Sequence, residues 1–270
     1  MNAFTSLLEK AKKRGVTYTS LDAMKLFAIV NMTADHLGAY FFPDHIGHML
    51  LPDHLWWRAI GRITFPVWFF LVGFSRSREI PRSLWVYAAI LVVDHLFVGM
   101  SLLPMNALIS VILSRMLLNW CEDKGWLPNR LPELMAACVL TSIFATALFE
   151  YGTMAFLYAL VGRMVYTKQK KHFLALCIVS YITFIAFQLM WFKFTPLQAA
   201  YVILGTGGVV WWLARCPIYT VVSDWTRTRT GILLTMLSRN TLPYYFYHRL
   251  IFEIISAVTV RHALGFAFRL

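Results

Sequence analysis

Charged residues are scarce in this chain of 270 residues, where they make up only 14% of the sequence. Acidic residues are the rarer sign, with 13 in total. A soluble domain usually carries about 25% charged residues, so the composition excludes a sizeable soluble domain. Hydrophobic residues make up 59% instead, the mean hydropathy is +0.61, and apolar runs fill nearly everything after Leu21. The chain is therefore predicted to be an integral membrane protein.

Cysteines are also few and scattered, without a CxxC pair or the spacing of a disulfide framework. We interpret the four of them as free thiols: Cys121, Cys138, Cys177 and Cys216. A glycine-rich phosphate-binding loop is missing too. The glycines at 205–208 lie inside an apolar run, where small residues favour close helix packing. The sequence contains no repeat of long period.

The net charge of +12 could indicate a nucleic-acid ligand. The basic residues cluster between apolar runs, however, and this pattern is typical of the positive-inside rule. We therefore expect a lipid bilayer and no nucleic acid as the partner of this surface. Nine apolar segments are candidate spans, although several are shorter than the roughly 20 residues that a bilayer requires. They cover 23–42, 59–75, 84–101, 104–120, 133–150, 152–166, 172–192, 197–214 and 241–260.

The basic residues also orient these spans. If the N-terminus is cytoplasmic, the outer segments keep only Arg58, Lys193, Arg261 and Arg269, while most other lysines and arginines between the spans face the cytosol. Eight or ten spans would destroy this asymmetry. The sequence thus predicts an all-α polytopic membrane bundle of about nine transmembrane helices, with the N-terminus cytoplasmic and the C-terminus external.

Two regions outside the spans have distinct predictions. Residues 1–19 place apolar side chains at helical spacing beside a basic cluster, which indicates an amphipathic helix on the cytoplasmic leaflet. Residues 20–270 then form a single transmembrane domain. Within it, 216–240 is predicted to be a cytoplasmic linker with an interfacial helix around 232–237.

Ionisable residues occur inside the predicted spans. Asp35-His36 and Asp94-His95 are two of four Asp-His pairs in the sequence. Asp35 lies about 15 Å along a helix from Lys25, which places it near the middle of the bilayer. Such residues cost several kcal/mol and usually mark a pathway or a reactive site. The alternative is a structural role, in which Asp35 and Asp94 neutralise two further embedded residues, Arg62 and Arg115.

The other two pairs, Asp44-His45 and Asp53-His54, lie in a predicted external loop beside two tryptophans. Together with His48 they could bind Zn²⁺, which takes histidine and carboxylate ligands. We favour an ordinary solvated loop at the membrane interface, and we expect no metal in the protein.

Several short motifs resemble those of one family. Lys25 precedes Asp35-His36 in the first span, and Gly61-Arg62 precedes Phe65-Pro66 in the second. Further matches are Asn106, Trp120-Cys121-Glu122, Tyr151-Gly152 and His248. In this order they resemble the TraX-type membrane proteins, the F-pilin acetylases. The resemblance implies a membrane acetyltransferase of the bacterial inner membrane that uses acetyl-CoA, takes part in conjugation and acetylates the N-terminal amine of a pilin.

The embedded residues fit such chemistry. An amine acceptor is mostly protonated near neutrality, so it needs a base, and His36 is the preferred candidate. We expect Asp35 to pair with Arg62, and Asp94 or Asn106 to orient His36. Arg62 or Asn106 would stabilise the oxyanion. His248 matches the family's histidine in the last helix, and a covalent acetyl-histidine remains an open alternative.

The donor site is predicted at the cytoplasmic ends of the spans. Basic side chains suit the phosphates of CoA, and the candidates are Arg76, Arg78 and the embedded Arg115. Two other classes of function remain open. Buried Asp and His residues could form the relay of a proton- or metal-coupled transporter, or the chain could be a non-catalytic assembly factor of a pilus or secretion system. The absence of an inverted repeat disfavours the transporter.

Overall fold

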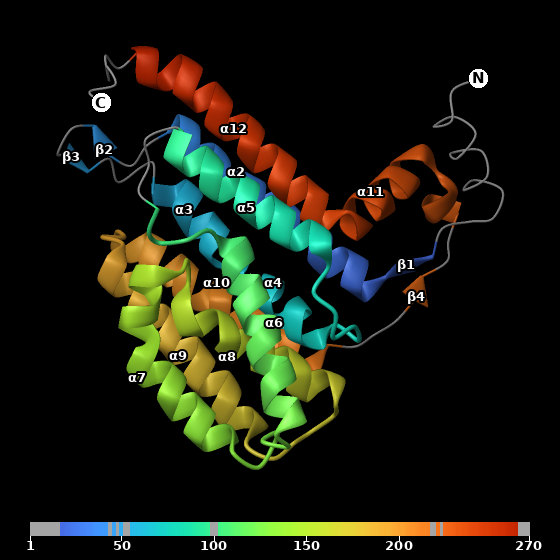
Figure 1. Cartoon of the computed structure of the whole chain (residues 1–270). Coiled ribbons are helices and arrows are strands. Elements are labelled where there is room, and N and C mark those ends of the chain that lie inside the picture. Colours follow the sequence, from blue (N-terminus) through green and yellow to red (C-terminus); the bar gives the residue numbers. More distant parts are fainter. Residues whose placement is uncertain are drawn as a thin grey trace.

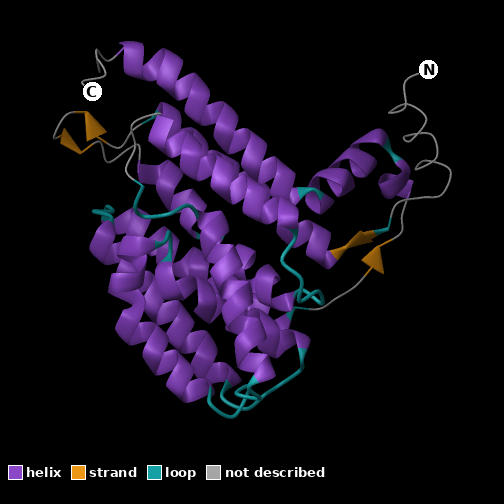
Figure 2. Cartoon of the chain, in the orientation of Figure 1, coloured by secondary structure: helices purple, strands orange, loops and turns teal. Residues whose placement is uncertain are grey.

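A computed structural model of the chain describes residues 17–42, 45–46, 49–50, 55–97, 102–216, 220–221 and 224–263. Their helices are α2 (Ser20–Phe41), α3 (Leu55–Arg62), α4 (Phe65–Phe74), α5 (Arg82–Phe97), α6 (Ala107–Asp123), α7 (Leu131–Leu148), α8 (Gly152–Tyr166), α9 (Phe173–Trp191), α10 (Pro196–Arg215), α11 (Arg229–Arg239) and α12 (Thr241–Ala263). A 3₁₀ helix, η2 (Asp224–Arg227), precedes α11. Two short antiparallel strand pairs complete the elements, with β1 (Tyr18–Thr19) on β4 (Thr220–Val221) and β2 (His45–Ile46) on β3 (Met49–Leu50). The all-helical class is confirmed (Figure 2).

Each predicted span coincides with a helix, except that the second is divided into α3 and α4. The break falls at Ile63–Thr64, directly before the Phe65-Pro66 motif, because Pro66 has no N–H to continue the preceding helix and suits a helix start. Within the described residues, α7, α9 and α10 are long and apolar enough to cross a membrane, which confirms a membrane protein. The number of spans and their orientation remain predictions.

The predictions for the regions outside the spans have separate outcomes. A helix does form over the linker position predicted to hold one, since 232–237 lies within α11. The helix predicted over 1–19 lies mostly outside the described residues, and its last two residues form β1 instead. The strand pairing of β1 with β4 places the start of α2 next to the segment that leads into α11.

The helices form two groups (Figure 1). In one group, α12 packs along α2 and α5; in the other, α8 packs against α4, α6, α7 and α9. The buried side chains form two hydrophobic clusters; α2 and α6 contribute residues to both, and Trp68 and Val111 contact both. Helix α8 is the centre of the larger cluster, where 154–161 are buried without interruption. A helix that is apolar on all sides is one that its neighbours surround.

Glycines allow the closest helix contact, between α4 and α8. A Cβ on Gly73 would collide with the carbonyl group of Ala159, and a Cβ on Gly162 would collide with the carbonyl group of Phe70. The two backbones therefore touch, as small residues allow in membrane helix pairs. This contact fixes α4, which forms one wall of the cavity described below.

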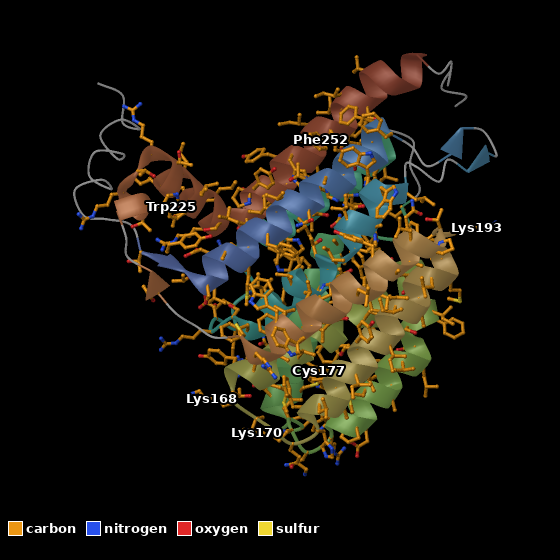
Figure 3. The ribbon with its side chains drawn as sticks, turned by 180° about the vertical axis from the view of Figure 1, so that it is seen from behind. Lys168, Lys170, Cys177, Lys193, Trp225 and Phe252 are labelled. Carbon is orange, nitrogen blue, oxygen red and sulfur yellow. The ribbon has the colours of Figure 1, made fainter. Side chains whose placement is uncertain are left out.

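The two ends of α9 carry the basic residues that the predicted topology assigns to opposite sides of the membrane. Lys168 and Lys170 precede α9, and Lys193 follows it. Figure 3 shows the first two at one end of the helical bundle and Lys193 at the other end. The arrangement is the one that a membrane-spanning α9 requires.

Candidate functional site

A cavity of about 550 Å³ lies between the two groups of helices. Its two ends differ in chemistry. One end is basic, with Lys25, Arg76 and Arg115, and the other contains Asp35, His36, Glu150, Tyr151 and Tyr245. The wall between them is largely apolar and includes Met32, Phe65, Trp68, Phe69, Leu108 and Val111. Lys25 and His36 both line the cavity from α2, about 16 Å apart along the helix axis.

The end of the cavity that contains Asp35 and His36 is called the inner end below. His36 meets His248 there. His36 Nδ1 lies 2.7 Å from His248 Nε2, and the two ring planes are 13° apart. His248 Nδ1 lies 2.7 Å from the carbonyl oxygen of Tyr244. A carbonyl can only accept a hydrogen bond, so His248 Nδ1 carries the proton and its Nε2 accepts. In the neutral pair His36 Nδ1 is therefore the donor, and His36 Nε2 keeps its lone pair.

The group that orients His36 is thus His248, and neither predicted candidate has this role. Asn106 caps α6, since its side-chain oxygen accepts from the backbone N–H groups of Leu108 and Ile109, at 3.1 and 3.4 Å. Its amide nitrogen donates to the carbonyl oxygen of Ala88, at 3.0 Å. Both ends of the Asn106 side-chain amide are therefore used in hydrogen bonds that cap α6 and hold it against α5. Asn106 does not reach His36. Asp94 lies beside Glu253 instead.

Asp35 does pair with Arg62, as predicted, and with a second arginine that the sequence analysis missed. Arg62 Nη2 lies 3.4 and 3.2 Å from the two Asp35 oxygens, and Arg58 Nη1 lies 2.9 Å from Oδ1. Both arginines project from α3 at i, i+4 spacing, which places them on one helix face. The i, i+4 spacing of the two arginines is visible in the sequence. In the sequence analysis, however, Arg58 was assigned to an external segment and so was not predicted as a partner of Asp35. A Cβ on Gly61 would collide with Asp35, so this glycine permits the contact.

Arg249 is the centre of a second polar cluster that the sequence analysis also missed. It donates from Nη1 to the Tyr245 hydroxyl at 2.9 Å, from Nη2 to His95 Nε2 at 2.7 Å and from Nε to the Tyr40 hydroxyl at 3.3 Å. Tyr40 in turn donates to Glu253, at 3.2 Å. Arg249 is only 8% exposed, although it is always charged. The sequence could have indicated this residue, because Arg249 directly follows His248 within a predicted span.

A strained turn presents Glu150 and Tyr151 to the inner end of the cavity. Tyr151 has a φ of 70°, in the left-handed region, and Gly152 follows with a φ of 50°. The conformation costs about 1–2 kcal/mol for a residue with a Cβ. Backbone hydrogen bonds hold the turn, because Glu150 N–H donates to the carbonyl oxygen of Met105 at 2.8 Å. The Tyr151-Gly152 motif is therefore explained by local geometry.

The predicted donor-site arginines divide into two groups. Arg115 donates to the carbonyl oxygen of Glu79, at 2.8 Å, and so anchors the loop that holds Arg76 at the basic end. Arg78 turns away and bonds Asp123 at 2.6 Å, a hydrogen bond that raises the pKa of Arg78 above its ordinary value. Arg115 makes no ion pair with Asp94 in the described part of the chain, so the structural alternative proposed for that pair is wrong.

No group of three or more possible metal ligands occurs among the described side chains. The outer pairs Asp44-His45 and Asp53-His54, with His48, lie outside the side chains that the structure describes. Zinc binding by that loop therefore stays an untested alternative.

Comparison with known proteins gives three findings. The profile of a family described as "TraX protein" matches residues 20–256. An uncharacterized protein of Rickettsia prowazekii (strain Madrid E) is 24% identical over 179 residues, which cover 66% of this chain and 68% of that protein. No solved structure matches the chain. The family match starts at the first residue of α2 and ends within α12, so it includes the helices that line the cavity.

The buried ion cluster predicts a large loss of stability when Asp35 alone is changed. Asp35→Asn would leave Arg58 and Arg62 without their carboxylate, and breaking a buried pair costs about 3–5 kcal/mol. We expect a much lower temperature of unfolding in detergent. It is measured as the temperature at which heating removes the monodisperse peak of the protein. Asp123→Asn is the control, because that exposed pair with Arg78 is worth about 1 kcal/mol or less. Equal unfolding temperatures for the two variants would contradict the role of Asp35.

Proposed function

The chain belongs to the TraX family, and on this basis we propose that it is a membrane acetyltransferase. It would move an acetyl group from cytosolic acetyl-CoA to an amine acceptor. One observation carries the proposal: a single cavity extends from a basic end to His36, a histidine that His248 holds in one tautomer. The family match supports it, and so does the apolar environment of the helices.

The cavity suits a CoA thioester in both shape and charge. Phosphates would bind at the basic end, near Lys25 and Arg76, where positive charge and N–H donors are available. The pantetheine arm would follow the largely apolar wall past Trp68, and the thioester would then reach His36. The volume of about 550 Å³ falls in the range of small-molecule sites.

In the proposed reaction the nitrogen of a neutral amine attacks the thioester carbonyl carbon. The amine proton passes to His36 Nε2, and the carbonyl electron pair moves to oxygen. When the carbonyl reforms, the carbon–sulfur bond breaks and the CoA thiolate takes the proton from His36. His248 keeps the imidazole of His36 in the reactive tautomer throughout, as the third member of a catalytic triad does. A covalent acetyl-histidine is the alternative route.

The acceptor that fits this proposal is the N-terminal amine of a pilin subunit, and the location is the inner membrane of a bacterium. The motif resemblance supports both, together with a role in conjugation. A proton-coupled transporter is the second candidate function. The observation that favours it is the buried cluster around Arg249, Glu253 and His95, which lies within predicted spans.

The donor site predicts that Arg76→Ala weakens acetyl-CoA binding about fivefold, the effect of losing about 1 kcal/mol from an exposed ionic contact. Isothermal calorimetry on detergent-purified protein measures the change. Arg82→Ala is the matched control, since Arg82 is also exposed, at the start of α5, but does not line the cavity. If the unaltered protein binds no CoA and instead drives ion-dependent uptake in liposomes, the transporter replaces the enzyme.

The acid–base role predicts that His36→Ala lowers turnover by about 10²–10⁴-fold, the usual contribution of a general base. The assay follows thiol release from acetyl-CoA with a short peptide that has a free N-terminal amine. Acetyl-CoA affinity and folded yield should stay normal. His172→Ala, at an exposed site before α9, is the control. His45→Ala and His54→Ala should also be nearly silent, and normal turnover of His36→Ala would place the base elsewhere.

The charge asymmetry predicts the topology of nine spans. Reporter fusions after Lys171 and Arg229 should be cytoplasmic, and a fusion after Leu270 should be external, because basic segments stay on the cytoplasmic side. Protease or enzymatic reporters on intact cells measure these positions. A cytoplasmic fusion after Leu270 would contradict the nine-span arrangement.

A further inference from the structure

We propose that the hydroxyl group of Tyr245, held by Arg249, donates the hydrogen bond that stabilises the oxyanion of the acyl transfer. This role rests on the proposed function and assigns a catalytic residue to it. It replaces the two oxyanion donors that the sequence suggested, Arg62 and Asn106. Asn106 is committed to capping α6, and the charge of Arg62 is neutralised by Asp35.

The first observation is the position of Tyr245. It lies on α12 one turn before His248 and lines the inner end of the cavity. Its ring centroid is 5.8 Å from that of His36 and 5.7 Å from that of His248, with both histidines edge-on to it. A thioester that reaches His36 would therefore lie beside the ring of Tyr245. In contrast, Arg62 does not line the cavity.

The second observation is the direction of the hydrogen bond between Arg249 and Tyr245. A guanidinium group can only donate, so the Tyr245 oxygen accepts and its own proton remains for another partner. In the described part of the chain, that proton has no acceptor. A hydroxyl that accepts a bond from a cation is polarised and becomes a better donor. Its effect on a developing oxyanion is larger in a site that excludes water.

The third observation is the way in which Arg249 itself is fixed. Its other hydrogen bonds go to neutral acceptors, His95 Nε2 and the Tyr40 hydroxyl. The Glu150 carboxylate is 3.7 Å away, so it does not bond the guanidinium as closely as Asp35 bonds Arg58. Arg249 is therefore held in one orientation while its charge still acts on Tyr245. We regard it as a positioning residue.

In the reaction the bond to Tyr245 forms and relaxes without a proton transfer. As the amine nitrogen attacks, the thioester oxygen gains an electron pair and accepts the hydrogen bond from Tyr245. As the carbon–sulfur bond breaks, the pair returns to the carbonyl and the bond weakens. The proton of the amine travels separately, through His36 to the leaving thiolate. Tyr245 is thus unchanged after each cycle.

The test is Tyr245→Phe in the full-length protein in detergent, assayed with acetyl-CoA and a short peptide with a free N-terminal amine. We expect kcat to fall about 10²–10³-fold, as it does when one oxyanion donor is removed. The calorimetric Kd for acetyl-CoA should stay within about twofold, because the ground-state carbonyl gains little from this bond. Tyr247→Phe is the matched control: it removes a hydroxyl from the same helix at an exposed position that does not line the cavity, and it should keep normal turnover.

A second variant tests the coupling and covers the case in which Tyr245→Phe fails to fold. Arg249→Lys keeps the charge but loses the planar fork, so it should also lower kcat with little change in Kd. If the two side chains act as one unit, the double variant should be no slower than Tyr245→Phe alone.

The outcomes separate this role from the proposed function. Turnover of Tyr245→Phe within about threefold of the unaltered protein overturns the role of Tyr245 and leaves the acetyltransferase intact. Fully additive losses in the double variant also overturn it, because they would show two independent contributions. If the unaltered protein neither binds acetyl-CoA nor releases thiol, the proposed function fails and the role of Tyr245 fails with it.

Discussion

The requirement that a charge inside a membrane protein be neutralised determines much of this structure. Asp35 is buried in the second half of α2, and its charge is compensated only because α3 presents Arg58 and Arg62 on one face. An isolated carboxylate at this depth would cost many kcal/mol. The pairing requires α3 to approach α2 closely, and Gly61 permits that approach. The helix must then break before Pro66, because α4 has to leave α2 and pack on α8. The cavity lies where α4 diverges from α2.

The three polar centres around the inner end of the cavity have different electrostatic properties, and these suit different tasks. Asp35 with its arginines is a closed ion cluster whose charges satisfy one another. The pair of His36 and His248 is neutral and leaves one lone pair on His36, which lines the cavity. Arg249 hydrogen-bonds neutral acceptors, and its ion pair with Glu150 is longer, at 3.7 Å, than the contact of Arg58 with Asp35, so its charge still acts on Tyr245. A fixed cation beside a cavity is an arrangement that stabilises a developing negative charge.

The sequence predicted the helices well and the side-chain partners poorly, for a physical reason. Apolar runs of 15 to 20 residues determine helices locally, so each predicted span coincides with a helix or, in one case, with two. The contact of His36 with His248 joins residues 212 positions apart, and it depends on how α2 and α12 are rotated about their axes. No local pattern sets that rotation. Asn106 shows a different error: an asparagine directly before an apolar run is a helix-capping signal, and chemistry was assigned to it first.

The hydrogen-bond chain that begins at His36 bears on the choice between an enzyme and a transporter. A proton relay needs each member to accept a proton on one side and release it on the other. The chain from His36 passes through His248 and ends at the backbone carbonyl of Tyr244, which has no proton to release and is far too weak a base to take one. A proton taken up at His36 Nε2 therefore has no exit along this chain. It must return to the cavity, where a departing thiolate would accept it. The terminated chain thus suits group transfer, in which the proton stays within the site, better than transport.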